Sequence, residues 1–301
     1  MVLVSATAFG TNAIFAKLAY RQGLGTSQTL AFRFILAALG MWALAAVLRQ
    51  NPLRIERRQF LALVGLGAIV YFGQSFTYFT ALRSLPASLC VLIVYVYPSM
   101  VVLAGWLFLR RHVSVWHGVA LVASFAGVVL LVGGAQLQIA WSLVFAIAAP
   151  TIYTGYILAG ERVMRAVPAV GASAVIMAGA AVSFTALAFF QGELAFPRSG
   201  GGWAVVLGLA LIPTMIAISL FLAGLPRIGA ARSALLSTWE PVVTVLLAVA
   251  LFGDSLSGVQ LAGGVLILAA AVLVVQSRGT RAAAGVPTIL AENGDQGPER
   301  R

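Results

Sequence analysis

Residues 225–254 read LPRIGAARSALLSTWEPVVTVLLAVALFGD, a mostly apolar segment with an acid, Glu240, near its middle. Its length suffices for a helix across the hydrocarbon core of a bilayer, which needs about 20 residues. A carboxylate at that depth costs several kcal/mol unless it is neutral, paired or facing water. Trp239 and Pro241 flank the acid, and Pro241 removes a helical hydrogen bond, which weakens or bends the helix there. We therefore predict a membrane helix whose Glu240 faces the interior of a helix bundle.

The same apolar character runs through nearly the whole chain of 301 residues, of which 61% are hydrophobic and only 9% charged. A soluble domain of this size needs more charge than that to cover its surface. The apolar runs are continuous, whereas the strands of a membrane β-barrel alternate. The composition therefore predicts an all-α membrane protein. Ten transmembrane helices are expected, at residues 1–20, 26–48, 59–81, 87–109, 115–133, 139–160, 169–191, 202–224, 230–252 and 256–277.

The first of these runs begins at Met1, so a cleavable signal peptide is the alternative to a first membrane helix. A signal peptide needs a basic start and a small-residue cleavage site. This run has neither, and it continues through Asn12 and Lys17 to a polar turn. We interpret it as the first membrane helix.

The arginines lie between the apolar runs and are unevenly shared between the two sides of the membrane. A net charge of +11 is also typical of nucleic-acid binding, but these arginines form no single stripe, so no nucleic-acid partner is expected. If both ends are cytoplasmic, the outer segments hold only Arg21, Arg83 and Arg198. The positive-inside rule then predicts a multi-pass protein of the bacterial inner membrane with both termini in the cytoplasm. The inner segments hold Arg49, Arg54, Arg57, Arg58, Arg110, Arg111, Arg162, Arg165, Arg227, Arg278 and Arg281.

An internal repeat divides the chain. Residues 82–132 align without a gap on residues 225–275, and the alignment pairs Pro98 with Pro241. Each half holds five expected spans, an odd number, so the second half must enter the membrane inverted relative to the first. Inverted repeats are typical of alternating-access carriers, whose substrate site lies near mid-membrane between the halves. We expect five-helix repeats at 1–133 and 139–277, followed by a disordered cytoplasmic tail at 278–301.

Several short motifs in this order carry a family resemblance. They are Gly10-Thr-Asn12, Arg33, Ala81-Leu82 through Pro98 to Gly127, Leu225-Pro-Arg-Ile-Gly-Ala-Ala-Arg232, Trp239-Glu240-Pro241, Leu251-Phe252-Gly253-Asp254, and Gln260 with Gly263-Gly264. Over residues 1–277 the sequence resembles an EamA-type member of the drug/metabolite transporter superfamily. The resemblance implies ten helices and a carrier, and it is strongest to the bacterial aromatic amino-acid exporters. Two positions matter for the comparison: the family's usual acid after the fourth helix is Arg111 here, and its counterpart in the second half is Asp254.

Polar and aromatic side chains inside the apolar runs are the candidate substrate ligands. Glu240 could bind a proton or a substrate ammonium, or it could be a structural acid paired with Arg232, two turns earlier. Tyr97 aligns with Glu240 in the internal repeat. Tyrosines and tryptophans also anchor helices at the membrane interface, which is the alternative for the rings. The predicted substrate-binding residues are Gln74, Tyr78, Tyr95, Tyr97, Tyr153, Tyr156, Trp239 and Glu240.

Four further polar residues in the membrane have structural interpretations. We expect Asn12 to hydrogen-bond another helix and Lys17 to extend its ammonium toward the outer face. Arg33 is expected to partner backbone carbonyls or a carboxylate. Arg232 is the candidate partner of Glu240.

The remaining motifs exclude other chemistry. No phosphate-binding G-x-x-x-x-G-K-[ST] motif is present, so no ATP hydrolysis is expected. The two histidines, His112 and His117, cannot build a metal site, and Cys90 is a small packing residue. No cofactor is expected. The sequence predicts a carrier that exports amino acids, with membrane lipid as its surroundings and proton coupling and oligomeric state left open. The alternatives are an exporter of other metabolites or drugs, an intramembrane enzyme, and a channel.

Overall fold

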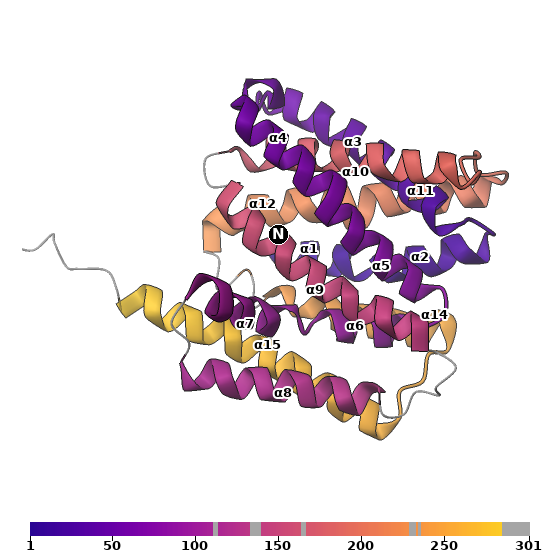
Figure 1. Cartoon of the computed structure of the whole chain (residues 1–301). Helices are drawn as coiled ribbons and strands as arrows, with labels where there is room; N and C mark the ends of the chain where they lie inside the picture. Colours follow the sequence, from indigo (N-terminus) through magenta and orange to yellow (C-terminus); the bar gives the residue numbers. More distant parts are fainter. Residues whose placement is uncertain (111–113, 133–139, 164–166, 229–232, 234–235, 285–301) are drawn as a thin grey trace, which may run out of the picture.

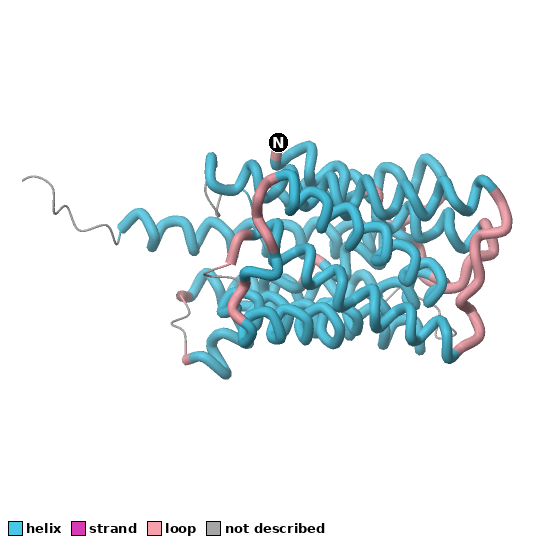
Figure 2. The backbone as a smooth tube through the Cα atoms, turned by 90° about the horizontal axis from the view of Figure 1, so that it is seen from above, coloured by secondary structure: helices cyan, strands magenta, loops and turns pink. Residues whose placement is uncertain are grey.

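A computed structural model describes residues 1–110, 114–132, 140–163, 167–228, 233 and 236–284. Within these ranges the secondary structure is helical, and no strand occurs. The helices run roughly along one axis, and the connecting loops gather at the two ends of the bundle (Figure 2). The helices of the first half are α1 (Val2–Gly10), α2 (Asn12–Arg21), α3 (Thr26–Val47), η1 (Pro52–Arg54), α4 (Arg57–Gly65), η2 (Leu66–Tyr71), α5 (Phe72–Leu82), α6 (Ala87–Val94), α7 (Tyr97–Leu109) and α8 (Val115–Val132).

The second half is built from the same kinds of element. Its helices are α9 (Ala140–Val163), α10 (Ala169–Phe190), α11 (Gly200–Ala210), η4 (Leu211–Ile216), α12 (Ala217–Ile228), α14 (Trp239–Phe252) and α15 (Gly258–Ala284).

Nine helical segments of the described chain are long and apolar enough to cross a membrane, and α14 is a shorter apolar helix. The span expected at 230–252 begins among residues outside the described ranges. The last helix differs from expectation at its other end, because α15 continues to Ala284 and so includes the first residues of the segment expected to be disordered. The rest of that expected tail, from residue 285, lies outside the described residues.

Two membrane helices are interrupted near their middle at matching places. Between α6 and α7 the chain turns at Tyr95 and Val96, and just before α14 it turns at Thr238. Pro98 and Pro241 therefore fall in the first turns of α7 and α14, where the missing N–H has no helical partner to lose. The defect predicted at Pro241 thus lies just before this proline.

Two further features shape the bundle. The first membrane helix is broken at Thr11, between α1 and α2, whereas α9 continues without interruption through Pro150. The segments η2 and η4 are π-helical turns inside otherwise α-helical spans. Such turns widen a helix locally and free a carbonyl from its usual partner.

Close helix pairs hold the bundle together. On one side α3 packs along α10, and on the opposite side α8 packs along α15 (Figure 1). In the second pair Gly127 and Gly263 face each other, and a Cβ built on either would lie 2.7 Å from the other's carbonyl oxygen. Small residues at such crossings let two backbones approach closely, which is how membrane helices gain packing energy without a hydrophobic driving force.

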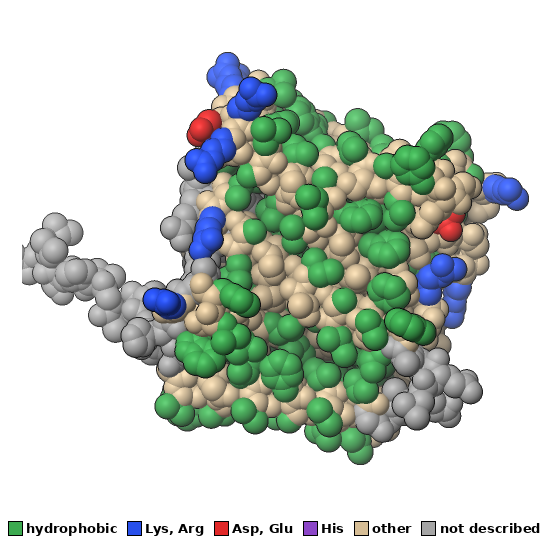
Figure 3. Space-filling model, in the orientation of Figure 1, with side chains coloured by type: hydrophobic (Ala, Val, Ile, Leu, Met, Phe, Trp, Pro, Cys, Tyr) green, Lys and Arg blue, Asp and Glu red, His purple; other side chains and the backbone are tan. Residues whose placement is uncertain are grey.

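Between these two pairs, helices of the two halves pack on one another. In this region α9 packs against α5 and α7, and α1 packs against α12 and α14. On the face drawn in Figure 3, hydrophobic side chains are spread between the two ends, while the Lys and Arg side chains gather toward the ends. That distribution is the one a bilayer requires of a spanning bundle.

Candidate functional site

A cavity of about 330 Å³ lies inside the bundle, between helices of both halves. Its walls come from both halves of the chain, from α1, α2, α3, η2, α5, α6, α7, α9, α10, α12 and α14, so no single half encloses it. Seven of the eight predicted substrate-binding residues line this cavity: Gln74, Tyr78, Tyr95, Tyr97, Tyr153, Tyr156 and Glu240.

Trp239 is the predicted ligand that the structure does not bring to the cavity. Its side chain is 41% exposed, and it is absent from the lining. Adjacent residues on a helix point about 100° apart, so the rotation that turns Glu240 inward turns Trp239 away. Substrate contact by Trp239 stays a prediction, and this placement puts its ring outside the cavity lining.

Tyrosine rings form a connected wall along the cavity. Ring centroids are 5.9 Å apart for Tyr95 and Tyr97, 4.9 Å for Tyr97 and Tyr153, and 5.8 Å for Tyr153 and Tyr156. Tyr71 continues the wall, 5.2 Å from Tyr156. Edge-to-face and offset contacts at these separations are favourable and keep the rings in place. The wall offers aromatic surface with hydroxyl groups at its edges.

Glu240 is held at one end of this wall. Its Oε2 lies 3.0 Å from the hydroxyl of Tyr95, and the same hydroxyl lies 2.7 Å from the carbonyl oxygen of Ser237. The Ser237 carbonyl belongs to the turn that precedes α14. Tyr95, in the corresponding interruption of the first half, therefore reaches across to the interruption of the second half.

The helix turn that carries Glu240 is fixed by α1. A Cβ on Gly10 would lie 2.9 Å from the backbone oxygen of Glu240 and 2.8 Å from the Cβ of Val243, so only glycine allows this approach. Thr244 donates its hydroxyl to the carbonyl of Gly10 at 2.8 Å. That bond occupies a carbonyl next to the break at Thr11, where the helical pattern of hydrogen bonds is interrupted.

Arg33 also lines the cavity, which its structural interpretation from sequence did not anticipate. The residue is only 4% exposed, and its guanidinium lies 5.0 Å from the ring centre of Phe34 and 5.3 Å from that of Phe79. Nε donates to the hydroxyl of Thr214 at 3.1 Å, and Thr214 donates to the carbonyl of Leu209 at 2.9 Å. Thr214 lies in the π-helical turn η4, so this turn positions the arginine.

The three other polar residues for which structural roles were predicted are placed differently. Asn12 lines the cavity, and its Oδ1 is buried without a hydrogen-bond partner among the residues that the structure describes. Lys17 is half-buried and lies outside the cavity lining. Arg232, the expected partner of Glu240, lies outside the described residues.

Other lining residues were not among the predicted ligands. Tyr71 shares a face with Gln74 and Tyr78 by helical spacing, so it could have been included. Ser173 and Met177 of α10 also line the cavity. Their helix is apolar on every side, and only its packing against its neighbours shows which face is turned inward.

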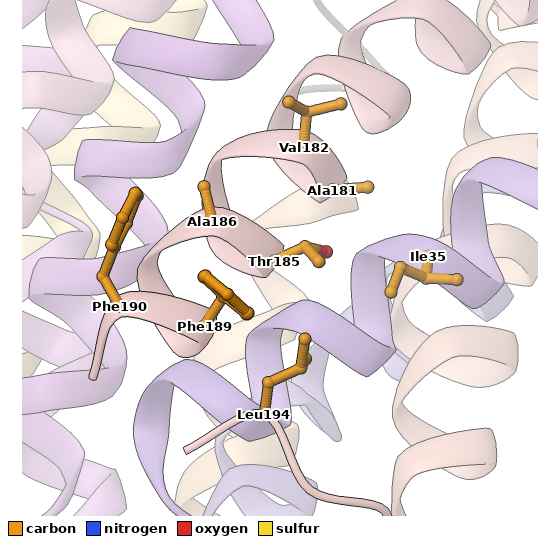
Figure 4. A pocket seen from close by; sticks show the side chains of 8 residues that line it. All are labelled: Ile35, Ala181, Val182, Thr185, Ala186, Phe189, Phe190 and Leu194. Carbon is orange, nitrogen blue, oxygen red and sulfur yellow. The ribbon is translucent and has the colours of Figure 1, made fainter. Parts of the chain in front are cut away.

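A second hollow, of about 630 Å³, lies on the outer surface beside α10 (Figure 4). Its walls are almost entirely apolar, and Val182, Phe189 and Phe190 are 70%, 67% and 84% exposed. Thr185 contributes the one hydroxyl among the labelled side chains. A surface groove of this composition suits lipid acyl chains, whereas the inner cavity combines rings with charged and amide groups.

A known protein family matches both halves of the chain. The sequence model described as the EamA-like transporter family matches the chain twice, at residues 1–133 and 140–276. The chain belongs to this family. The two matches cover nearly all of the helical bundle, so the cavity of this EamA-family member lies between two copies of the family's domain.

Two relatives share between a quarter and a third of their residues with the chain. The chain is 29% identical over 289 residues to a protein of Ancylobacter novellus named aromatic amino acid exporter YddG, covering 91% of this chain and 98% of the relative. It is 25% identical over 274 residues to a Bacillus subtilis protein named uncharacterized transporter YcbK, covering 87% of each. A crystal structure with 24% identity superposes with a TM-score of 0.65 over 94% of this chain and 97% of the other, a likeness in fold. These relatives, with the apolar helices, identify a multi-pass membrane transporter.

Proposed function

We propose that this EamA-family transporter exports amino acids, chiefly those with aromatic or large apolar side chains, through the central cavity. The observation that carries the proposal is the lining, in which a wall of tyrosines leads to one buried acid, Glu240. A cavity of about 330 Å³ has the size of a small-molecule site. Favourable ring contacts contribute about 0.5–1.5 kcal/mol each beyond area burial. The exporter name of the Ancylobacter relative supports the same substrate class.

We further propose that the two halves are inverted repeats and that export proceeds by alternating access between them. Reciprocal packing supports the repeat. Helix α9, the first of the second half, packs on α5 and α7, and the first helix of the first half, α1, packs on α12 and α14. Likewise α10 packs on η2, and α3 packs on η4. Exchanging the halves thus preserves the pattern of contacts, as a two-fold axis would.

Orientation is part of the proposal. The described helix ends that flank the α3–α4, α7–α8 and α9–α10 connections lie at one end of the bundle (Figure 1), and the sequence there, with the adjoining helix turns, carries eight arginines: Arg49, Arg54, Arg57, Arg58, Arg110, Arg111, Arg162 and Arg165. The opposite end carries Arg21, Arg83 and Arg198. By the positive-inside rule the arginine-rich end and both termini are cytoplasmic, in a bacterial inner membrane.

Purified protein in liposomes tests the function. Saturable uptake of labelled phenylalanine, competed more strongly by leucine and tyrosine than by alanine, is the expected result. Protein-free liposomes and heat-denatured protein are the controls. An ohmic current without saturation would indicate a channel, and a chemically altered product an enzyme. Saturable transport of an organic cation or a sugar, with no amino-acid transport, would move the proposal to another class of metabolite.

A further inference from the structure

We infer that Arg33 and Glu240 bind the two charges of a zwitterionic substrate, Arg33 the carboxylate and Glu240 the ammonium. The inference rests on the proposed function and deepens it by naming the residues that recognise the amino-acid head group. Among the residues that line the cavity in the described chain, Arg33 and Glu240 are the charged ones, and they have opposite signs.

Most of the N–H donors of the Arg33 guanidinium have no hydrogen-bond acceptor within the described residues. It has five N–H donors, and within the described residues only Nε has a hydrogen-bond acceptor, the hydroxyl of Thr214 at 3.1 Å. The rings of Phe34 and Phe79 contact it through their faces, which compensates a cation only in part. A buried guanidinium normally has an anion to pair with. The Nη groups therefore retain the donors that bind a carboxylate side by side.

The way Arg33 is held suits this role. Thr214, in the π-helical turn η4, accepts a hydrogen bond from Nε and donates one to the carbonyl of Leu209, five residues back in α11. An arginine anchored through Nε presents its two Nη groups in a fixed orientation. Little side-chain freedom then remains to be lost when a carboxylate binds.

Around Glu240 the cavity offers acceptors instead of donors. Glu240 carries the charge, and the Oδ1 of Asn12 is a buried acceptor without a partner in the described part of the chain. Asn12 begins α2, which packs on α14, the helix of Glu240. A substrate ammonium has three donors, so a carboxylate and an amide oxygen together fit it. The ammonium and carboxylate of an α-amino acid sit on one carbon, so Arg33 and Glu240 would bind neighbouring groups of the substrate, and the tyrosine wall is left for its apolar side chain.

Three ligands that differ only in the head group test the assignment. Phenylalanine has both charges, 2-phenylethylamine lacks the carboxylate, and 3-phenylpropionate lacks the ammonium. Affinity is measured in detergent as inhibition of labelled phenylalanine binding, or as a shift in melting temperature with ligand. We expect the unsubstituted protein to prefer phenylalanine over either analogue by about tenfold or more, the equivalent of about 1.4 kcal/mol.

The variants separate the two contacts. Arg33→Gln should weaken phenylalanine and phenylpropionate by about tenfold while leaving phenylethylamine unchanged. Glu240→Gln should weaken phenylalanine and phenylethylamine and leave phenylpropionate unchanged. Arg83→Gln and Glu56→Gln, at exposed positions of the two ends, are the matched controls and should change none of the three affinities.

A second variant tests the same assignment if the Arg33→Gln protein does not fold. Thr214→Val keeps the arginine and the side-chain volume but removes the anchor, and it should weaken phenylalanine more than phenylethylamine. Equal weakening of phenylalanine and phenylethylamine in Arg33→Gln or Thr214→Val would overturn the carboxylate assignment and leave a structural arginine. If the folded, unsubstituted protein did not bind phenylalanine, that result would instead contradict the proposed function itself.

Discussion

The hydroxyl of Tyr95 lies 3.0 Å from the Oε2 of Glu240, and this contact joins the interrupted helices of the two halves at the cavity. The same hydroxyl reaches the carbonyl of Ser237 at 2.7 Å. A phenol has a single proton to donate. Tyr95 therefore cannot give a full hydrogen bond to both oxygens at once, and the protonation of Glu240 decides how the two halves are joined here.

Tyr95→Phe removes this link. We expect a loss of about 1 kcal/mol in unfolding free energy, typical of one hydrogen bond, together with a clear loss of transport, because Glu240 is no longer oriented. Tyr20→Phe is the matched control, since the Tyr20 hydroxyl donates to the carbonyl of Phe79 at 2.7 Å, and Tyr20 is not a lining residue. The control should lose similar stability with transport unchanged. Equal transport loss in both variants would assign Tyr95 a structural role only.

The tyrosine wall should set the preference for large substrates. Tyr153 contacts the rings of both Tyr97 and Tyr156. Tyr153→Ala should therefore raise the half-saturating concentration of phenylalanine more than that of alanine, by roughly 3- to 10-fold if one ring contact is lost. Trp239→Ala, outside the cavity, should leave the ratio between the two substrates unchanged. A changed ratio in Trp239→Ala alone would place the substrate elsewhere.

The close approach of α1 to α14 gives a packing prediction. Gly10→Ala places a methyl group 2.8 Å from the Cβ of Val243 and 2.9 Å from the Glu240 carbonyl oxygen, so the helices must separate. We expect destabilisation of about 1–3 kcal/mol, the usual effect of overpacking, with reduced transport per folded molecule. Gly118→Ala, where the added methyl meets nothing within 4 Å, should be neutral or slightly stabilising. Thermal unfolding in detergent with transport from the same preparation measures both effects.

The polar residues that line the cavity could be predicted from the sequence because such groups stand out in apolar helices. Glu240 and the tyrosines at 95, 97, 153 and 156 are examples, and all of them line one cavity. The side of a helix on which each side chain lies was harder to predict. Trp239 is next to Glu240 in the sequence, yet it lies outside the cavity lining. The rotation of a uniformly apolar helix depends on its partners, which one sequence does not display.

The partners of polar groups were also beyond sequence reasoning. The bond from Arg33 to Thr214 joins residues 181 positions apart. It depends on the π-helical turn η4, which no pattern of residues in the sequence predicted. Pro241 illustrates a smaller error, since a proline inside an apolar run can either bend a helix or begin one. The break at Thr238 places it in a first turn, where its missing N–H costs little.

Orientation in the membrane is tested with single cysteines after Cys90→Ala, because Cys90 is the chain's one cysteine. Gly200→Cys lies at the start of α11, where an added side chain meets nothing within 4 Å, and Asn51→Cys lies at the opposite end of the bundle. With both termini cytoplasmic, an impermeant thiol reagent should label the cysteine at 200 in intact spheroplasts and the one at 51 only after permeabilisation. The reverse pattern would contradict the proposed orientation.

Glu240 is the group on which proton coupling would depend. When it is protonated, it can donate to Tyr95, which then donates to the Ser237 carbonyl. When it is ionised, it competes with that carbonyl for the tyrosine proton. A proton and a substrate ammonium would also compete for the same carboxylate, so loading one releases the other. This is the requirement for exchanging protons against amino acids across the membrane.

Glu240→Gln tests that exchange, because the glutamine amide can donate to Tyr95 as a protonated acid would, but it cannot release the proton. In proteoliposomes with an imposed pH gradient, the unsubstituted protein should accumulate phenylalanine against its concentration gradient, and the variant should not. Exchange of labelled for unlabelled phenylalanine should persist in the variant when measured above its raised half-saturating concentration. The folded fraction is followed in the same preparation, since a purely structural acid would lower stability and leave transport per folded molecule unchanged. A folded Glu240→Gln protein that still responds to the pH gradient would assign the coupling to another group.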